Sequence, residues 1–135
     1  MKYFFFDVDG TLTNIKTGEF IQSGLDTIKK LEEKGNFVAI ATGRAYYKTI
    51  PAAKKAGIHN FVANGGAALV INDKLIRNAP LDKEKALKII HEVDALGYGI
   101  LVANSDSIDV LMKDHRFLEQ AGGEKSRPTT SISRI

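Results

Sequence analysis

Cysteine is missing from all 135 residues of the chain, which excludes disulfide bonds and metal sites built on thiolates. The three histidines are scattered singly, so a histidine-based metal cluster is not expected either. No stretch approaches the roughly 18 apolar residues of a membrane span. Asp7 and Asp9 also interrupt the apolar run at the start, which therefore does not match a signal sequence. These absences favour a cytoplasmic protein.

The charge is weakly basic and evenly distributed. The net charge is +3, and lysines and glutamates are mixed along the chain rather than grouped in blocks. Without a basic stripe, a nucleic-acid partner is not expected, whereas a small anionic ligand is compatible with a mild positive charge. The sequence has no internal repeat and no low-complexity tract, and its 44% apolar content is ordinary for a globular protein.

The most informative stretch is residues 3–12, where an aromatic run leads directly into Asp7-Val8-Asp9-Gly10-Thr11-Leu12. Residues 3–6 are wholly apolar, which predicts a strand buried on both faces of a parallel sheet. Two carboxylates after such a strand are costly to place unless they meet water, a cation or hydrogen-bond donors. We therefore expect Asp7 and Asp9 to lie in the crevice at the carboxyl ends of the strands, where open α/β sheets bind ligands.

Strand and helix patterns alternate after this stretch. Strands are predicted at 2–8, 36–41 and 61–63, with helices from Ser23 to Gly35 and over 45–56 between them. This order predicts a doubly wound parallel α/β sheet. Ser23 with Asp26 matches a helix-capping box, and Pro51 is expected to restart the second helix rather than lie in its interior. The three strand tips should converge on one edge of the sheet; they are Asp7–Thr11, Thr42–Arg44 and Asn64–Gly66.

The pattern changes after Gly66, and Pro80 marks the expected boundary between a core (1–80) and a second unit (81–135). A hairpin around Asn72-Asp73 precedes the boundary. An amphipathic helix over 82–96, strands over 98–104 and 108–113, and a short helix over 114–121 are predicted to follow it. The polar tail from residue 124 onward is expected to be frayed.

The two acids fit magnesium-dependent phosphoryl chemistry. Mg²⁺ prefers one or two carboxylates together with waters and a substrate phosphate, and Asp7 and Asp9 could supply the carboxylates. An ionised aspartate beside a cation is a nucleophile toward phosphorus, and the second acid could transfer protons if its pKa differs from its neighbour's. The Thr42 hydroxyl, the Gly43 amide and the Arg44 guanidinium could hold phosphoryl oxygens at the start of the second helix.

Three motifs together resemble those of the haloacid dehalogenase (HAD) superfamily of magnesium-dependent phosphatases. They are Asp-Val-Asp-Gly-Thr-Leu at 7–12, Ala-Thr-Gly-Arg at 41–44 and Asn-Gly-Gly at 64–66. The last two are similar to the Cof-type branch, in which a large α/β cap is inserted after the third strand. The resemblance covers residues 1–113, so that residues 81–135 would be a partial cap.

The resemblance implies a set of residue roles. Asp7 would be the nucleophile and a metal ligand, and Asp9 would be the acid/base residue and bind the metal through its backbone carbonyl. The cofactor would be Mg²⁺, and the substrate a sugar phosphate or another small phosphate ester. Asn64 and Gly65 would lie near the substrate, and the phosphate would be bound by Gly10, Thr11, Thr42, Gly43 and Arg44.

The chain departs from the family pattern after the cap begins. Members of this branch return from the cap with a lysine that neutralises the phosphorylated aspartate and a Gly-Asp step whose acids complete the magnesium site. Neither follows here, so the chain resembles an enzyme truncated within its cap. The last core strands, which would pair beside the first, are also missing. The first strand is therefore expected to form a free hydrophobic edge that favours self-association.

Two alternatives remain beside the phosphatase. One is a catalytically incomplete remnant, or an interaction module, that retains the fold. The other is a compact capless phosphatase, in which the strand over 98–104 and nearby residues replace the missing motifs; the replacements would be Lys85 or Lys88 and Asp106 or Asp109. A receiver-type phosphoacceptor domain is disfavoured because its acceptor aspartate would occupy the position of Asn64.

Overall fold

The structure is a computed structural model, and it describes residues 1–103, 105–121 and 132–134. The chain divides into two compact units, Met1–Pro80 and Leu81–Ile135. No helix within the described ranges is long and apolar enough to cross a membrane. The tail that was expected to be frayed lies outside the described residues, except for a short strand at 132–134.

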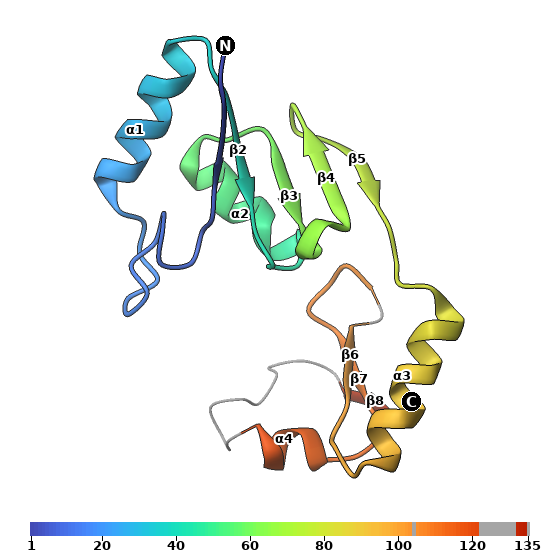
Figure 1. The fold of residues 1–135 in the computed structure, drawn as a ribbon. Coiled ribbons are helices and arrows are strands. Elements are labelled where there is room, and N and C mark those ends of the chain that lie inside the picture. The colour runs from blue at the N-terminus through green and yellow to red at the C-terminus, as the bar shows by residue number, and fades with distance from the viewer. Residues whose placement is uncertain (104, 122–131, 135) are drawn as a thin grey trace. The chain divides into compact units, whose positions relative to one another are not determined.

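The first unit contains a five-stranded mixed sheet (Figure 1). Its strands follow one another in space in sequence order: β1 (Tyr3–Phe6), β2 (Phe37–Ala41), β3 (Phe61–Ala63), β4 (Ala68–Ile71) and β5 (Lys74–Asn78). The first three strands are parallel, and β4 and β5 form an antiparallel hairpin beside them. The hairpin turns at Asn72 and Asp73, both with positive φ, as the sequence predicted. The parallel α/β class is thereby confirmed.

Two helices connect the parallel strands: α1 (Gln22–Glu33) follows β1, and α2 (Tyr46–Ala56) follows β2. The strand order advances in one direction only, and β-α-β crossovers are almost always right-handed, so both helices cover the same face of the sheet. Ile28 of α1 and Ala52 of α2 accordingly join one buried cluster. The strand residues of that cluster lie in register with one another; they are Phe4, Phe6, Val38, Ile40, Phe61, Ala63, Ala68 and Val70.

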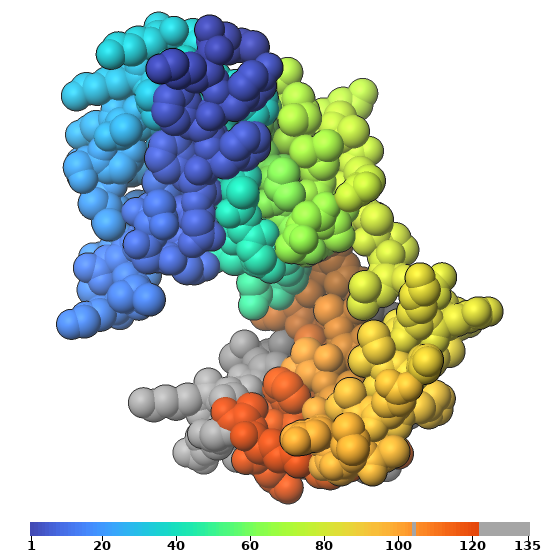
Figure 2. All heavy atoms as spheres, viewed as in Figure 1, coloured from blue at the N-terminus to red at the C-terminus, as the bar shows by residue number. Residues whose placement is uncertain are grey.

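The opposite face of β1 is open, so the prediction that this strand is buried on both faces is wrong. Tyr3 and Phe5 are 62% and 58% exposed, and the atoms of the first residues lie uncovered in Figure 2 (dark blue). The reason is that α1 and α2 both pack on the face that carries Phe4 and Phe6. Within the described residues, β1 is also the terminal strand and pairs with β2 alone. The outer edge of β1 is thus unpaired among the described residues.

Two local predictions about the helices are also wrong. α1 begins at Gln22 without a side-chain cap; Ser23 lies inside the helix, and Asp26 accepts a hydrogen bond from the Gln22 side chain instead. α2 runs through Pro51 without restarting. Ala52 and Ala53 follow the proline and are buried against the sheet, so tertiary packing offsets the loss of one helical hydrogen bond.

The second unit contains a helix followed by a small three-stranded sheet. Asp82 caps α3 (Lys83–Ala95) by accepting a hydrogen bond from the Lys85 amide. The sheet consists of β6 (Leu101–Ala103), β7 (Val110–Met112) and β8 (Ile132–Arg134), and α4 (Arg116–Gln120) lies between β7 and β8 in sequence. β8, which pairs parallel with β7, was not predicted.

The topology of the second unit bears on the capless alternative. In that alternative, the strand over 98–104 and the residues after it replace the missing motifs. β6 pairs with β7 in a sheet separate from that of β1–β5, which disfavours this alternative. The apolar face of α3 is also incompletely covered, since Ile89 and Leu96 are 57% and 73% exposed.

Candidate active site

The first motif forms a tight turn directly after β1. The Val8 carbonyl accepts hydrogen bonds from the Thr13 amide and the Thr13 hydroxyl, both at 2.9 Å. Val8 and Thr13 are buried, and Gly10 between them has a φ of 82°, which favours glycine. Asp7 and Asp9 flank the buried Val8 and are themselves exposed. The turn thus anchors itself in the core and leaves both acids at the surface.

The second motif follows β2, and hydrogen bonds to β3 and within the motif itself hold it in place. The Thr42 amide donates a hydrogen bond to the Val62 carbonyl at 3.0 Å, and the Thr42 hydroxyl accepts one from the Arg44 amide at 3.2 Å. Because that hydroxyl acts as an acceptor here, its proton remains available to a phosphate oxygen. A Cβ added to Gly43 would meet no atom within 4 Å. The loop therefore has open space beside Gly43, whereas Thr42 is buried, with 8% of its surface exposed.

Arg44 joins the first two motifs. Its Nε donates a hydrogen bond to Asp9 Oδ2 at 2.8 Å, and its Nη2 donates a second to Asp9 Oδ1. These hydrogen bonds hold the pKa of Asp9 below its ordinary value, against the opposing effect of partial burial. The same contacts, with a smaller contribution from Asp7, raise the pKa of Arg44. Asp9 is therefore an ionised carboxylate in this arrangement.

The third motif adds Asn64, which contacts the loop of the second. The Asn64 amide donates a hydrogen bond to the Arg44 carbonyl at 2.8 Å, and its Oδ1 accepts one from the Tyr46 amide at 2.9 Å. The first amide of α2 is thus satisfied by a side chain and is not open to an anion. Gly65 follows in the same turn with a φ of 60°. The structure brings the three strand tips together, as expected from a parallel sheet.

Asp7 and Asp9 are suited to a magnesium site that retains open positions. Within the described part of the chain, no three histidine, aspartate or glutamate side chains gather into a metal cluster. Magnesium needs only one or two carboxylates when waters and a phosphate complete its shell. The exposed Asp7 carboxylate accepts no hydrogen bond from a described residue, so it is available as a ligand or nucleophile.

The remaining predicted residues make local contacts. Thr11 lies exposed in the first turn, where its amide approaches the Val8 carbonyl at 3.4 Å. In the second unit, Lys88 is paired with Glu92 at 3.8 Å. Asp109 accepts a hydrogen bond from a serine two residues earlier. Asp106, like Asp109, lies between β6 and β7, and Lys85 lies in the first turn of α3.

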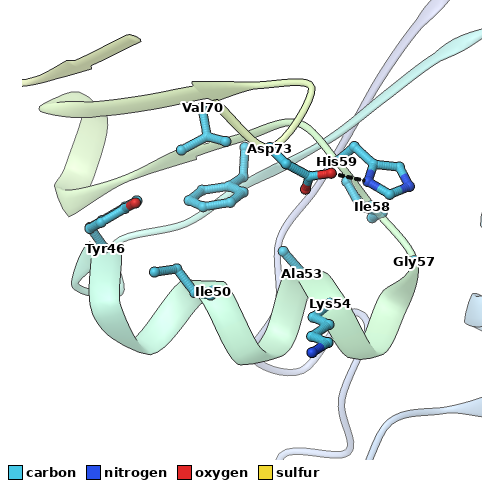
Figure 3. A pocket seen from close by; sticks show the side chains of 10 residues that line it. Tyr46, Ile50, Ala53, Lys54, Gly57, Ile58, His59, Val70 and Asp73 are labelled. Atoms are coloured by element: carbon cyan, nitrogen blue, oxygen red, sulfur yellow. Dashed lines mark hydrogen bonds and ion pairs between the residues drawn. The ribbon is translucent and has the colours of Figure 1, made fainter. Parts of the chain in front are cut away.

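Sequence reasoning missed a cavity of about 390 Å³ between α2 and the β3–β4 strands. Tyr46, Ile50 and Val70 line it, and a 2.6 Å hydrogen bond between His59 Nδ1 and Asp73 Oδ2 lies at one end (Figure 3). The cavity does not include either acid of the first motif.

The family model of haloacid dehalogenase-like hydrolases matches residues 4–133, and the chain belongs to this family. The resemblance of the three motifs is thereby confirmed. Among curated proteins, the chain is 27% identical over 126 residues to the putative phosphatase YkrA of Bacillus subtilis (strain 168). That alignment covers 93% of this chain and 49% of YkrA.

Solved structures show the same fold. BT1666 from Bacteroides thetaiotaomicron, described among the phosphatases of the HAD superfamily, matches with a TM-score of 0.81 at 24% identity, over 98% of this chain and 49% of its own. The HAD subclass IIB sugar phosphatase BT4131 matches with a TM-score of 0.72 at 17% identity, over 100% and 52% of the two chains. The chain thus spans about half the length of the relatives it matches.

Proposed function

We propose that this chain carries the nucleophile and phosphate-binding part of a magnesium-dependent phosphatase that hydrolyses a small phosphate ester. The observation that carries the proposal is the exposed Asp7 carboxylate beside the Arg44–Asp9 pair, at the carboxyl edge of three parallel strands. Membership of the hydrolase family and the similarity to YkrA support it. A sugar phosphate is the proposed substrate class, supported by the fold shared with a sugar phosphatase.

The proposed reaction proceeds in two steps on Asp7. Its carboxylate attacks phosphorus and forms an aspartyl phosphate while the ester oxygen leaves, and water then hydrolyses that intermediate. Asp9 gives a proton to the leaving oxygen and takes one from the attacking water. The Thr42 hydroxyl and the Gly43 amide hold phosphoryl oxygens. Mg²⁺ bound by Asp7 and the Asp9 carbonyl would neutralise charge on the phosphate.

Arg44 has a double role in this scheme. In the absence of phosphate its guanidinium binds Asp9, which keeps Asp9 ionised. A phosphate dianion offers the guanidinium a competing bidentate partner. Movement of Arg44 toward the phosphate would remove the cause of the lowered pKa, so that Asp9 could hold the proton that the leaving group needs.

A hydrolysis assay tests the proposal. The wild-type chain, Asp7→Asn and Lys85→Ala are compared with p-nitrophenyl phosphate and Mg²⁺. We expect Asp7→Asn to abolish turnover, because an amide cannot attack phosphorus, and Lys85→Ala to leave it unchanged. Detection of a phosphoryl adduct on the Asp7 peptide by mass spectrometry separates the first step from the second. Equal rates and no adduct for wild type and Asp7→Asn would favour the incomplete remnant or interaction module instead.

We also propose that the free edge of β1 allows self-association with a second copy. The supporting observations are the pairing of β1 with β2 alone among the described strands and the exposure of Tyr3 and Phe5. Unpaired strand edges with apolar side chains are templates for pairing with another chain. The cytoplasmic location and the lack of a nucleic-acid partner stay predictions from the sequence.

A further inference from the structure

We propose that Asn64 is a positioning residue of this site. It holds the loop over residues 42–46 so that Arg44 keeps its bidentate hydrogen bonds to Asp9. The relevance of this contact to catalysis, as the arrangement that precedes phosphate binding, rests on the proposed function. The positions of Asn64, Arg44 and Asp9 do not depend on the proposed function, because they are set by hydrogen bonds within the first unit.

Asn64 reaches both sides of the residue that follows Arg44. Its backbone amide donates to the Arg44 carbonyl at 2.8 Å, and its side-chain Oδ1 accepts from the Tyr46 amide at 2.9 Å. These two hydrogen bonds bracket Ala45, which is the N-cap of α2 and provides no side-chain cap of its own. An asparagine from another strand tip therefore replaces the capping group that the helix lacks.

The other side of Asn64 is anchored to the end of the hairpin. Its Nδ2 donates to Asn78 Oδ1 at 3.0 Å. Two further hydrogen bonds join the turn to the same end of β5: Arg77 Nη2 to the Gly66 carbonyl and the Ala79 amide to the Ala67 carbonyl, each 3.0 Å. The turn that carries Asn64 is thus tied to the sheet independently of the loop that it holds.

The backbone of Asn64 explains why this residue type stands here. Its φ is 52°, in the left-handed region that asparagine enters more readily than other residues with a side chain. Glycine would accept this conformation but would lose both side-chain hydrogen bonds. Aspartate would retain an acceptor for the Tyr46 amide and would lose the donor to Asn78.

The contact that depends on this loop is sensitive to small displacements. A guanidinium and a carboxylate form two parallel hydrogen bonds only when their planes and separation match. Arg44 supplies both donors from a loop whose carbonyl and following amide are fixed by Asn64. Loss of the Asn64 contacts should therefore weaken the hydrogen bonds between Arg44 and Asp9 while the strands stay paired.

Solvent exchange of the Arg44 Nε proton, followed by ¹H–¹⁵N NMR, tests the proposal without requiring turnover. The Asp9→Asn variant identifies the Arg44 Nε signal and gives the exchange rate of that proton when the Asp9 carboxylate is lost. We expect Asn64→Gly to accelerate exchange about tenfold, because loss of the Tyr46 contact should free Arg44 Nε from its charge-assisted hydrogen bond to Asp9. Asn64→Asp should keep exchange near the wild-type rate. Asn72→Gly is the matched control, because Asn72 also has a positive φ, of 50°, but lies at the far turn of the hairpin; it should have no effect.

Wild-type exchange in folded Asn64→Gly would overturn the proposal, as would equal acceleration in Asn64→Asp and Asn64→Gly. If Asn64→Gly does not fold, the Asn64→Asp variant decides, since rapid exchange in it contradicts the role of the Oδ1 acceptor. An absence of hydrolysis would overturn the proposed function alone, because the exchange rate is measured without substrate.

Discussion

Phe5 and Ile40 lie in neighbouring strands of one sheet but on opposite faces, so their replacement by alanine tests whether the outer face of β1 is open. Phe5 in β1 is 58% exposed, whereas Ile40 in β2 is 0% exposed. The register pairs Phe5 with Ala39, and Ile40 with Phe6 of the buried cluster.

The expected losses of stability differ severalfold. Complete burial of a phenylalanine side chain contributes about 1.5–3 kcal/mol to the free energy of unfolding. Phe5 has less than half of its surface buried, so Phe5→Ala should cost about 1 kcal/mol or less. Ile40→Ala removes a fully buried side chain and leaves a cavity in the core, which typically costs about 2–5 kcal/mol.

Urea unfolding followed by far-UV circular dichroism measures both losses. With a denaturant slope of about 2 kcal/mol per molar urea, Ile40→Ala should lower the midpoint by about 1 M or more, and Phe5→Ala by about 0.5 M or less. The measurement is made at low protein concentration, so that self-association contributes little. Equal losses from the two variants would refute the open outer face of β1, because they would require Phe5 to be covered.

The same face makes a second measurement informative. Light scattering should show the apparent mass of the wild type rising with concentration, and Phe5→Lys should suppress that rise, because a charge on the open face opposes pairing. A wild-type monomer at every concentration would contradict the proposed association.

The remaining predictions concern Gly99 and Asp94 in the second unit, with Gly43 of the first unit as a comparison. A Cβ on Gly99 would lie 1.9 Å from the backbone nitrogen of Phe117, so Gly99→Ala should destabilise this unit by about 1–3 kcal/mol in thermal unfolding. Gly43→Ala, at an open position, should leave the melting temperature unchanged. Hydrogen bonds from Lys113 and from a neighbouring arginine lower the pKa of Asp94 from its ordinary 3.8. The resulting stabilisation is present above that pH and is lost as the pH falls through the lower folded value. Acid titration should therefore destabilise the wild type more steeply than Asp94→Asn; equal slopes would contradict the assignment.

Much of the fold followed from local patterns in the sequence. The apolar runs that became β2 and β3 are short, bounded by glycine or polar residues, and separated by helical periodicity, which is sufficient to predict parallel strands. The hairpin was predictable because Asn72 and Asp73 tolerate the positive φ that its turn requires. Helix details were less predictable. Serine is favoured at the N-cap of helices, but α1 begins at Gln22, one residue before Ser23.

The sequence by itself determined which residues can carry the chemistry. Asp7, Asp9 and Thr42 follow strands that the pattern makes parallel, and parallel strands bring their carboxyl ends to one edge. Only the tertiary structure decided which of these side chains engage one another. The Arg44–Asp9 contact and its support by Asn64 depend on strand register and loop conformation across three separate strand tips, which no local pattern encodes. The exposure of β1 was decided in the same way, since burial of a strand depends on the neighbours that the whole sheet supplies.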